Sequence, residues 1–120
     1  MKVKISDLVN AKESLNKIYT NSNIPTREAY KIYTVLSKLQ PAYDFFEEKR
    51  EGVFKSIGVL EGENYIIPDE KINDFYQEMN KVGDLYCEEE LEKIDISLDI
   101  DLGVSPAEIA LLTPFINFVE

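Results

Sequence analysis

Histidine and tryptophan are absent from this chain of 120 residues, and cysteine occurs once, as Cys87. Without histidine the chain lacks Ser-His and Cys-His nucleophile pairs, the commonest general base and the commonest transition-metal ligand. The five glycines are scattered, so there is no glycine-rich phosphate loop. These absences predict a protein that is not an enzyme and carries no cofactor.

Long apolar runs are missing as well, and the N-terminus has no apolar core of a signal peptide. A single cysteine excludes an intramolecular disulfide framework and is typical of a reducing compartment. The length suits one domain with one core, and 44% of the residues are hydrophobic. We therefore expect a single soluble, intracellular domain over residues 1–120 that makes no contact with a membrane.

Positive charge is scarce in the second half of the chain. Residues 1–60 carry a net charge of +3, whereas residues 61–120 carry three lysines, sixteen acidic residues and a net charge of -13. Phosphate contacts need clustered lysine and arginine, so this half is not expected to bind nucleic acid directly. The acidity serves either as a soluble surface or as a face for a basic partner, which it would attract over long range.

Three-four spacing of apolar residues predicts the main helices. The stripe from Ala29 to Ile57 indicates a long helix of about 32 residues, with Arg50 as its one polar exception. Pro41 predicts a kink near Leu39–Gln40 or two abutting helices, because proline cannot donate to the carbonyl of Ser37. A second stripe, from Ile72 to Tyr86, predicts a helix that opens near Pro68 and packs antiparallel on the first.

Shorter elements complete the expected fold. Residues 2–5 alternate like a strand, Ser6 resembles the N-cap of a helix over about 7–20, and residues 65–68 form a short strand. Ser105, Pro106 and Glu108 make a capping box, which predicts a short helix that Pro114 ends or kinks. The expected fold is α+β and mainly α: a long antiparallel helical hairpin with an N-terminal helix, a short capped C-terminal helix and a small β-sheet.

Three stretches resemble a family of short, uncharacterised proteins encoded by tailed phages and prophages, classed as a domain of unknown function. They are KVKISDLVNAKESLNKI, the long helix entered through IPTREAYKIYTVLSKL and continued as FFEEKREGVFKSIG, and the tail DLGVSPAEIALLTPFI. Pro41 departs from the family pattern. The resemblance implies a phage or prophage origin and an accessory role, in the host cytoplasm or alternatively in the virion, and it transfers no catalytic residue.

The stretch Ile94–Leu102, IDISLDIDL, alternates apolar and polar residues as a half-buried strand does. Asp95, Asp99 and Asp101 would share its outward face, with about 7 Å between neighbours. This spacing is too wide for one small ion, and the Asp-x-Asp-x-Gly run ending at Gly103 lacks the bidentate glutamate of a calcium loop. No metal site is expected, and the face is either solvated strand surface or part of an acidic band.

The acidic band and two exposed aromatic residues are the predicted partner-binding residues. Tyr33 and Phe45 lie off the main stripe of the long helix, where an aromatic side chain can anchor an interface. Arg50 would pair with a glutamate of the following helix or face a second subunit. The predicted partner-binding residues are Glu88, Glu89, Glu90, Glu92, Asp95, Asp99, Asp101, Tyr33 and Phe45.

Two functions remain open at this point. The first is a non-enzymatic phage-encoded accessory protein that binds a basic host or phage protein through its acidic half and possesses no nucleic-acid contact of its own. Such a protein would inhibit a host nucleic-acid-binding or defence protein by imitating a phosphate backbone. The second is a structural or assembly component of the virion that forms a homo-oligomer through its long helices.

Overall fold

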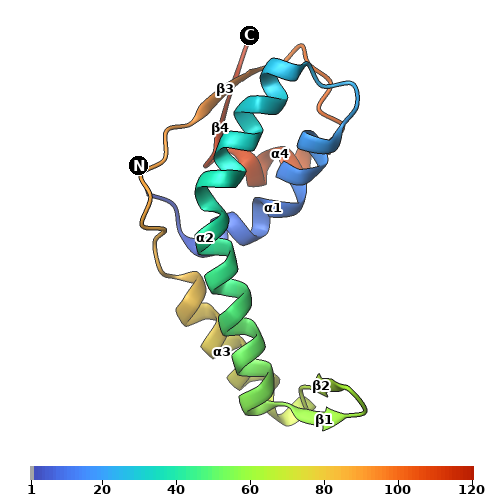
Figure 1. Cartoon of the computed structure of the whole chain (residues 1–120), viewed down its shortest axis with the longest axis vertical. Coiled ribbons are helices and arrows are strands. Elements are labelled where there is room, and N and C mark those ends of the chain that lie inside the picture. The colour runs from blue at the N-terminus through green and yellow to red at the C-terminus, as the bar shows by residue number, and fades with distance from the viewer. Residues whose placement is uncertain (1) are drawn as a thin grey trace.

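The structure is a computed structural model that describes residues 2–120, and it is elongated (Figure 1). Its extents are 49 × 29 × 22 Å, and its radius of gyration is 16.7 Å, against ~14 Å for a compact chain of this length. In chain order the elements are α1 (Ile5–Thr20), α2 (Thr26–Ile57), β1 (Val59–Glu61), β2 (Asn64–Ile66), the 3-10 helix η1 (Asp69–Lys71), α3 (Ile72–Gly83), β3 (Ile94–Ser97), α4 (Pro106–Leu112) and β4 (Ile116–Val119). The fold is α+β and mainly α, as predicted.

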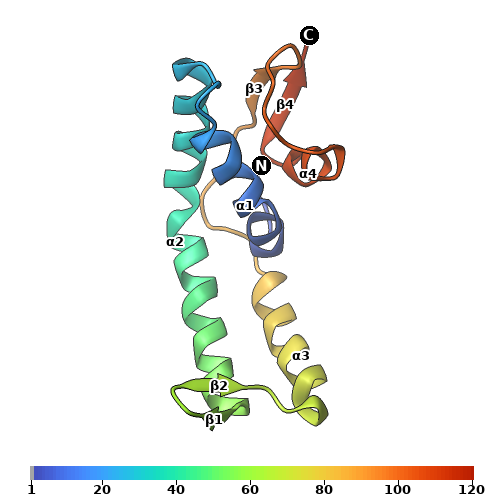
Figure 2. The ribbon, with the colours of Figure 1, turned by 90° about the vertical axis from the view of Figure 1, so that its right-hand side faces the viewer.

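The upper region in Figure 2, which we call the head, comprises residues 2–40 and 87–120. There α1 packs against both α2 and α4, and β3 pairs in parallel with β4, with Ile96 opposite Phe118. Parallel strands need a crossover, which α4 supplies. Every buried apolar side chain of the described residues lies in the head, among them Leu15, Ile18, Ile32, Leu39, Ile96, Leu112 and Phe115.

The lower region, which we call the arm, comprises residues 41–86 (Figure 2). The C-terminal half of α2 and α3 lie side by side and antiparallel, and the rings of Phe54 and Phe75 are 4.9 Å apart between centroids. The antiparallel β1–β2 hairpin closes the far end, where Gly62 supplies the positive φ of 65° that its two-residue turn needs. This confirms the predicted helical hairpin.

Helix α2 joins the two regions without a break, so the prediction of two abutting helices is wrong. Pro41 lies inside it, and Figure 1 shows the helix axis changing direction about halfway along. Pro41 has no N–H for the carbonyl of Ser37, which accounts for a bend at this place. The bend coincides with the boundary between head and arm.

Several local predictions are wrong. Residues 2–5 form only an isolated bridge, Lys4 to Tyr86, and α1 already begins at Ile5. Ser6 is therefore inside the helix, and the backbone N–H of Lys4 donates to Asp7 Oδ2 instead, at 3.3 Å. Tyr86 lies beyond α3, which ends at Gly83, so it does not belong to that helical stripe.

The strand expected over Ile94–Leu102 ends at Ser97. The chain then turns, with the N–H of Ile100 donating to the carbonyl of Ser97, and Leu98 is exposed. Asp99 and Asp101 therefore do not share a strand face with Asp95, since the period of two holds only within a strand. The capping box of α4 is confirmed: Glu108 N–H donates to Ser105 Oγ, and Ser105 N–H donates to Glu108 Oε1.

Candidate functional site

An apolar pocket of about 320 Å³ lies where the head meets the arm. Three separate parts of the chain form it: the start of α1, the middle of α2 and the segment that follows α3. Its walls are Ile5, Pro41, Ala42, Phe45, Leu85, Tyr86, Cys87, Glu88 and Glu89. The pocket thus brings together three of the predicted partner-binding residues, namely Phe45, Glu88 and Glu89.

Backbone hydrogen bonds hold the wall that follows α3. Ile5 N–H donates to the carbonyl of Leu85, and Cys87 N–H donates to the carbonyl of Val3, both at 2.8 Å. These bonds tie the segment to the N-terminus in an extended conformation and leave Leu85 and Tyr86 at the surface. Helix α2 contributes the small side chain of Ala42, the ring of Pro41 and the ring of Phe45 to the lining.

The rim of the pocket is unusually apolar for exposed surface. Phe45, Leu85 and Tyr86 are 38%, 50% and 58% exposed. Sequence reasoning found Phe45 but missed Leu85 and Tyr86, because it extended the helical stripe through Tyr86. The signal was present at Gly83 and Asp84, which end the helix and place the next residues outside its packed face.

The charges that line the pocket are both negative. Glu88 is exposed and Glu89 is half-buried. Burial raises the pKa of the Cys87 thiol, and the charge of Glu89 raises it further. A buried thiol of this kind stays protonated and is a poor nucleophile.

Beyond the pocket, the acidic segment Glu88–Asp101 climbs along the head beside α2 to the turn after β3 (Figure 1). Glu88, Glu92, Asp95, Asp99 and Asp101 are exposed. Within residues 2–120, these five and Glu89 form no ion pair. Of these six side chains in the described chain, that of Asp101 alone forms a hydrogen bond: it accepts from Gly103 N–H at 3.0 Å.

The remaining acidic prediction, Glu90, lies in the same segment and is exposed. Its side chain has an interaction within the protein, so it differs from its neighbours. The predicted acidic band is therefore a line of carboxylates along the head rather than a cluster. No group of three His, Cys, Asp or Glu side chains in residues 2–120 could hold a metal ion.

Tyr33 lies elsewhere, on the surface between α1 and α2. It is 50% exposed and belongs to a group of tyrosines: its ring is 6.1 Å from that of Tyr19 and 6.3 Å from that of Tyr30. The prediction that Tyr33 and Phe45 are exposed is correct, but the two residues line different hollows. A single side chain of a partner therefore cannot contact both Tyr33 and Phe45.

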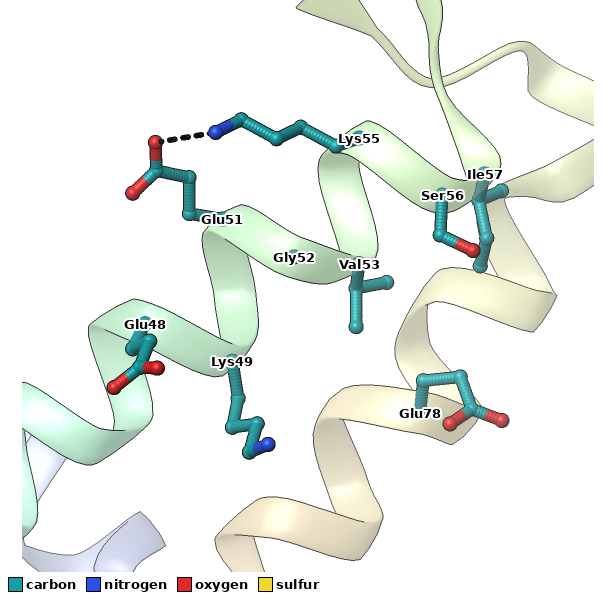
Figure 3. Close-up of a pocket in the computed structure, with 9 residues that line it drawn as sticks. All are labelled: Glu48, Lys49, Glu51, Gly52, Val53, Lys55, Ser56, Ile57 and Glu78. Atoms are coloured by element: carbon teal, nitrogen blue, oxygen red, sulfur yellow. Dashed lines mark ion pairs between the residues drawn. The ribbon is translucent and has the colours of Figure 1, made fainter.

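A second hollow, of about 650 Å³, opens between α2 and α3 in the arm (Figure 3). Residues of both charges line it, among them Lys49 of α2 and Glu78 of α3, and Val53 contributes an apolar surface. Arg50 does not pair with α3, as had been one prediction. It lies 3.9 Å from Glu47 of its own helix and over the ring of Phe54.

Comparison with known proteins gives no matching family model, no matching curated protein and no matching solved structure. Among the helices of residues 2–120, none is both long and apolar enough to cross a membrane. The site must accordingly be interpreted from its own chemistry: an apolar hollow, two carboxylates at its rim and a line of further carboxylates beside it.

Proposed function

We propose that this protein is a non-enzymatic binding protein that recognises a basic protein surface through the acidic segment Glu88–Asp101. The observation that carries the proposal is that six carboxylates of this segment have no ion pair in the described chain. Lys93 lies within the segment, and two further lysines of the head pair with carboxylates outside it. Lys17 pairs with Glu108, and Lys31 pairs with Glu28 and donates to the carbonyl of Asp95.

Such a surface suits association with a cationic partner. Exposed carboxylates in a row attract lysine and arginine over a distance of about one Debye length, ~8–10 Å at physiological salt. They contribute mainly to the association rate and to specificity, and their effect falls as salt is added. The resemblance to phage-encoded proteins makes a host nucleic-acid-binding or defence protein the partner class to test first.

The test compares two charge reversals of equal size in a pull-down from a bacterial lysate. One variant carries Asp95→Lys, Asp99→Lys and Asp101→Lys; the matched control carries Glu61→Lys, Glu63→Lys and Glu70→Lys, which are exposed carboxylates of the arm. We expect the wild type and the control to retain a basic protein at low salt and to release it at high salt. The variant with the three lysines in the head should not retain it. Equal retention by the head variant would contradict the proposal.

A second candidate function, assembly through the long helices, is favoured by a different observation. In the described residues, no side chain of the arm is fully buried, and the tip exposes Val59, Leu60 and Ile66. When only two helices pack together, the apolar side chains between them stay partly exposed to water. A second copy of the arm would cover these side chains, as in a four-helix bundle. We propose self-association of the arm as the alternative.

Sedimentation of the pure protein from about 1 to 100 μM, the range in which weak oligomers form, tests this alternative. A dimer that Val53→Lys dissociates, while the head variant Tyr33→Lys does not, would support it. A monomer over the whole range would remove it. The pull-down and the sedimentation experiment are independent, so either function can fail alone.

A further inference from the structure

We propose that the pocket at the head–arm junction receives an apolar side chain of the basic partner, and that Glu88 and Glu89 pair with lysine or arginine next to it in the partner sequence. This inference rests on the proposed function and specifies how the partner is recognised. The ligand is thus a basic amphipathic segment of a protein rather than a uniformly cationic surface.

The apolar part of the inference follows from the walls of the pocket. Seven of the nine lining residues are apolar side chains or cysteine, and those at the rim are the exposed Phe45, Leu85 and Tyr86. Burying such side chains removes apolar surface from water, which favours association. Aromatic residues that surround a hollow are also the commonest energetic centres of protein interfaces.

The size of the pocket limits what it can hold. A volume of about 320 Å³ lies at the lower end of the ~300–1,000 Å³ typical of ligand pockets. It therefore suits one or two large side chains rather than a whole helix face. In the partner, the apolar side chain that enters the pocket must be followed by polar residues that lie on the surface outside it.

The charge of that polar chain follows from the rim. The only charged residues that line the pocket are Glu88 and Glu89, and neither forms an ion pair in the described chain. Two lysines lie close by, but they stack on the outer rings: Lys4 lies 5.9 Å from the ring centre of Tyr86, and Lys49 lies 5.4 Å from that of Phe45. The charges that line the pocket itself are thus negative, and the two lysines lie over its aromatic rings.

The groove of the arm does not offer the same combination. Its charged residues are of both signs, with Glu48, Glu51 and Glu78 against Lys49 and Lys55, and Glu51 is paired with Lys55 at 3.1 Å (Figure 3). Of these two hollows, the junction pocket is the one that combines apolar walls with lining charges of one sign. Charge complementarity therefore assigns the basic segment to the junction.

The experiment uses two fluorescent peptides of equal length and charge, one an amphipathic helix of leucine and lysine, the other with serine in place of every leucine. Their affinities are measured by fluorescence anisotropy at low salt. The wild type should bind the leucine peptide at least about tenfold more tightly, the gain expected from one buried large apolar side chain. Phe45→Ala and Leu85→Ser should each remove most of this preference while the affinity for the serine peptide stays unchanged.

Two control variants and the serine peptide separate the possible outcomes. Tyr33→Ala removes another exposed aromatic residue of α2, one that lies outside the pocket, and Val53→Ser changes the groove of the arm; both should keep the preference for leucine. If both peptides bind equally well, or if Phe45→Ala and Leu85→Ser keep the preference, the pocket is not the anchor site, although the acidic segment can still bind a basic partner. If neither peptide binds, the proposed function fails together with this inference.

Discussion

The head and the arm share α2, and the two halves of this helix carry the same three-four stripe. In the head, Ile32 and Leu39 of this stripe are completely buried; in the arm, Val53 and Ile57 are only half-buried. The difference comes from the number of layers. The head half packs on α1 and β3, and α4 and β4 cover these two elements in turn, whereas α3 is the main helix beside the arm half (Figure 2).

This comparison shows that an amphipathic stripe indicates which face of a helix is covered but not how completely. A side chain that is enclosed on all sides needs neighbours from more than two elements. The arm lacks them, and it exposes large apolar residues at its tip and beside the junction pocket; the head exposes others, among them Tyr30, Leu98 and Leu111. The closed core is thus confined to the head, whereas exposed apolar surface occurs in both regions.

The largest expected effect separates the cores of the two regions. Phe115→Ala removes a fully buried ring of the head and should lower the free energy of unfolding by about 3–5 kcal/mol. Phe75→Ala removes a half-buried ring of the arm that contacts Phe54, and should cost only about 1–2 kcal/mol. Urea denaturation followed by circular dichroism measures both; equal losses would mean that the arm core is as closed as that of the head.

The next effect concerns the boundary itself. Pro41→Ala should raise the free energy of unfolding by about 1–3 kcal/mol, because alanine restores the N–H that the carbonyl of Ser37 lacks. Amide hydrogen exchange should show higher protection in residues 42–57 of α2, since the helix of the arm is then continuous with the stable head. Unchanged stability and protection would show that Pro41 does not weaken the junction.

A smaller, pH-dependent effect is expected within the head. Backbone N–H donation from Ser105 lowers the pKa of Glu108, and hydrogen bonds from Lys17 and Ser14 lower it further. The charged form therefore stabilises the folded state above the unfolded pKa, about 4.3, and this contribution is lost as the pH falls through the lower folded pKa.

Glu108→Gln should accordingly lower the melting temperature at pH 7, and the difference from the wild type should shrink as the solution is acidified below pH ~4.3. Glutamine keeps the shape of the capping box, so the change isolates the charge. The control is Glu92→Gln, an exposed carboxylate of the head that forms no ion pair within residues 2–120, and this variant should melt like the wild type at pH 7. A difference for Glu108→Gln that does not vary with pH would contradict this account.

The smallest effect is expected at the tip of the arm. Leu60→Ser changes an exposed side chain of the β1–β2 hairpin and should alter the free energy of unfolding by less than about 0.5 kcal/mol. Thermal melts at several protein concentrations measure it. A larger loss that grows with concentration would indicate that a second copy covers the tip, and would favour the assembly function.

Local sequence signals determined most of the elements. The three-four stripes gave the long α2 and its antiparallel partner, and the capping box at Ser105 gave the start of α4, because helix periodicity and capping depend on residues within one or two turns. The short strand expected at residues 65–68 corresponds to β2, but neither its partner β1 nor the hairpin turn at Gly62 was predicted. The charge difference between the halves of the chain, from which the acidic segment was predicted, also needs no structure.

Only the tertiary structure decided where these elements meet. The strand at Ile94 ends at Ser97 because its pairing with β4 ends there, and the segment after α3 is extended because it bonds to residues 3 and 5 at the other end of the chain. The junction pocket depends on the same contact, which joins residues eighty or more positions apart. Pairing at such separation depends on the packing of the whole chain, so helix periodicity could predict Phe45 and the charge distribution could predict Glu88, but neither could predict their common site.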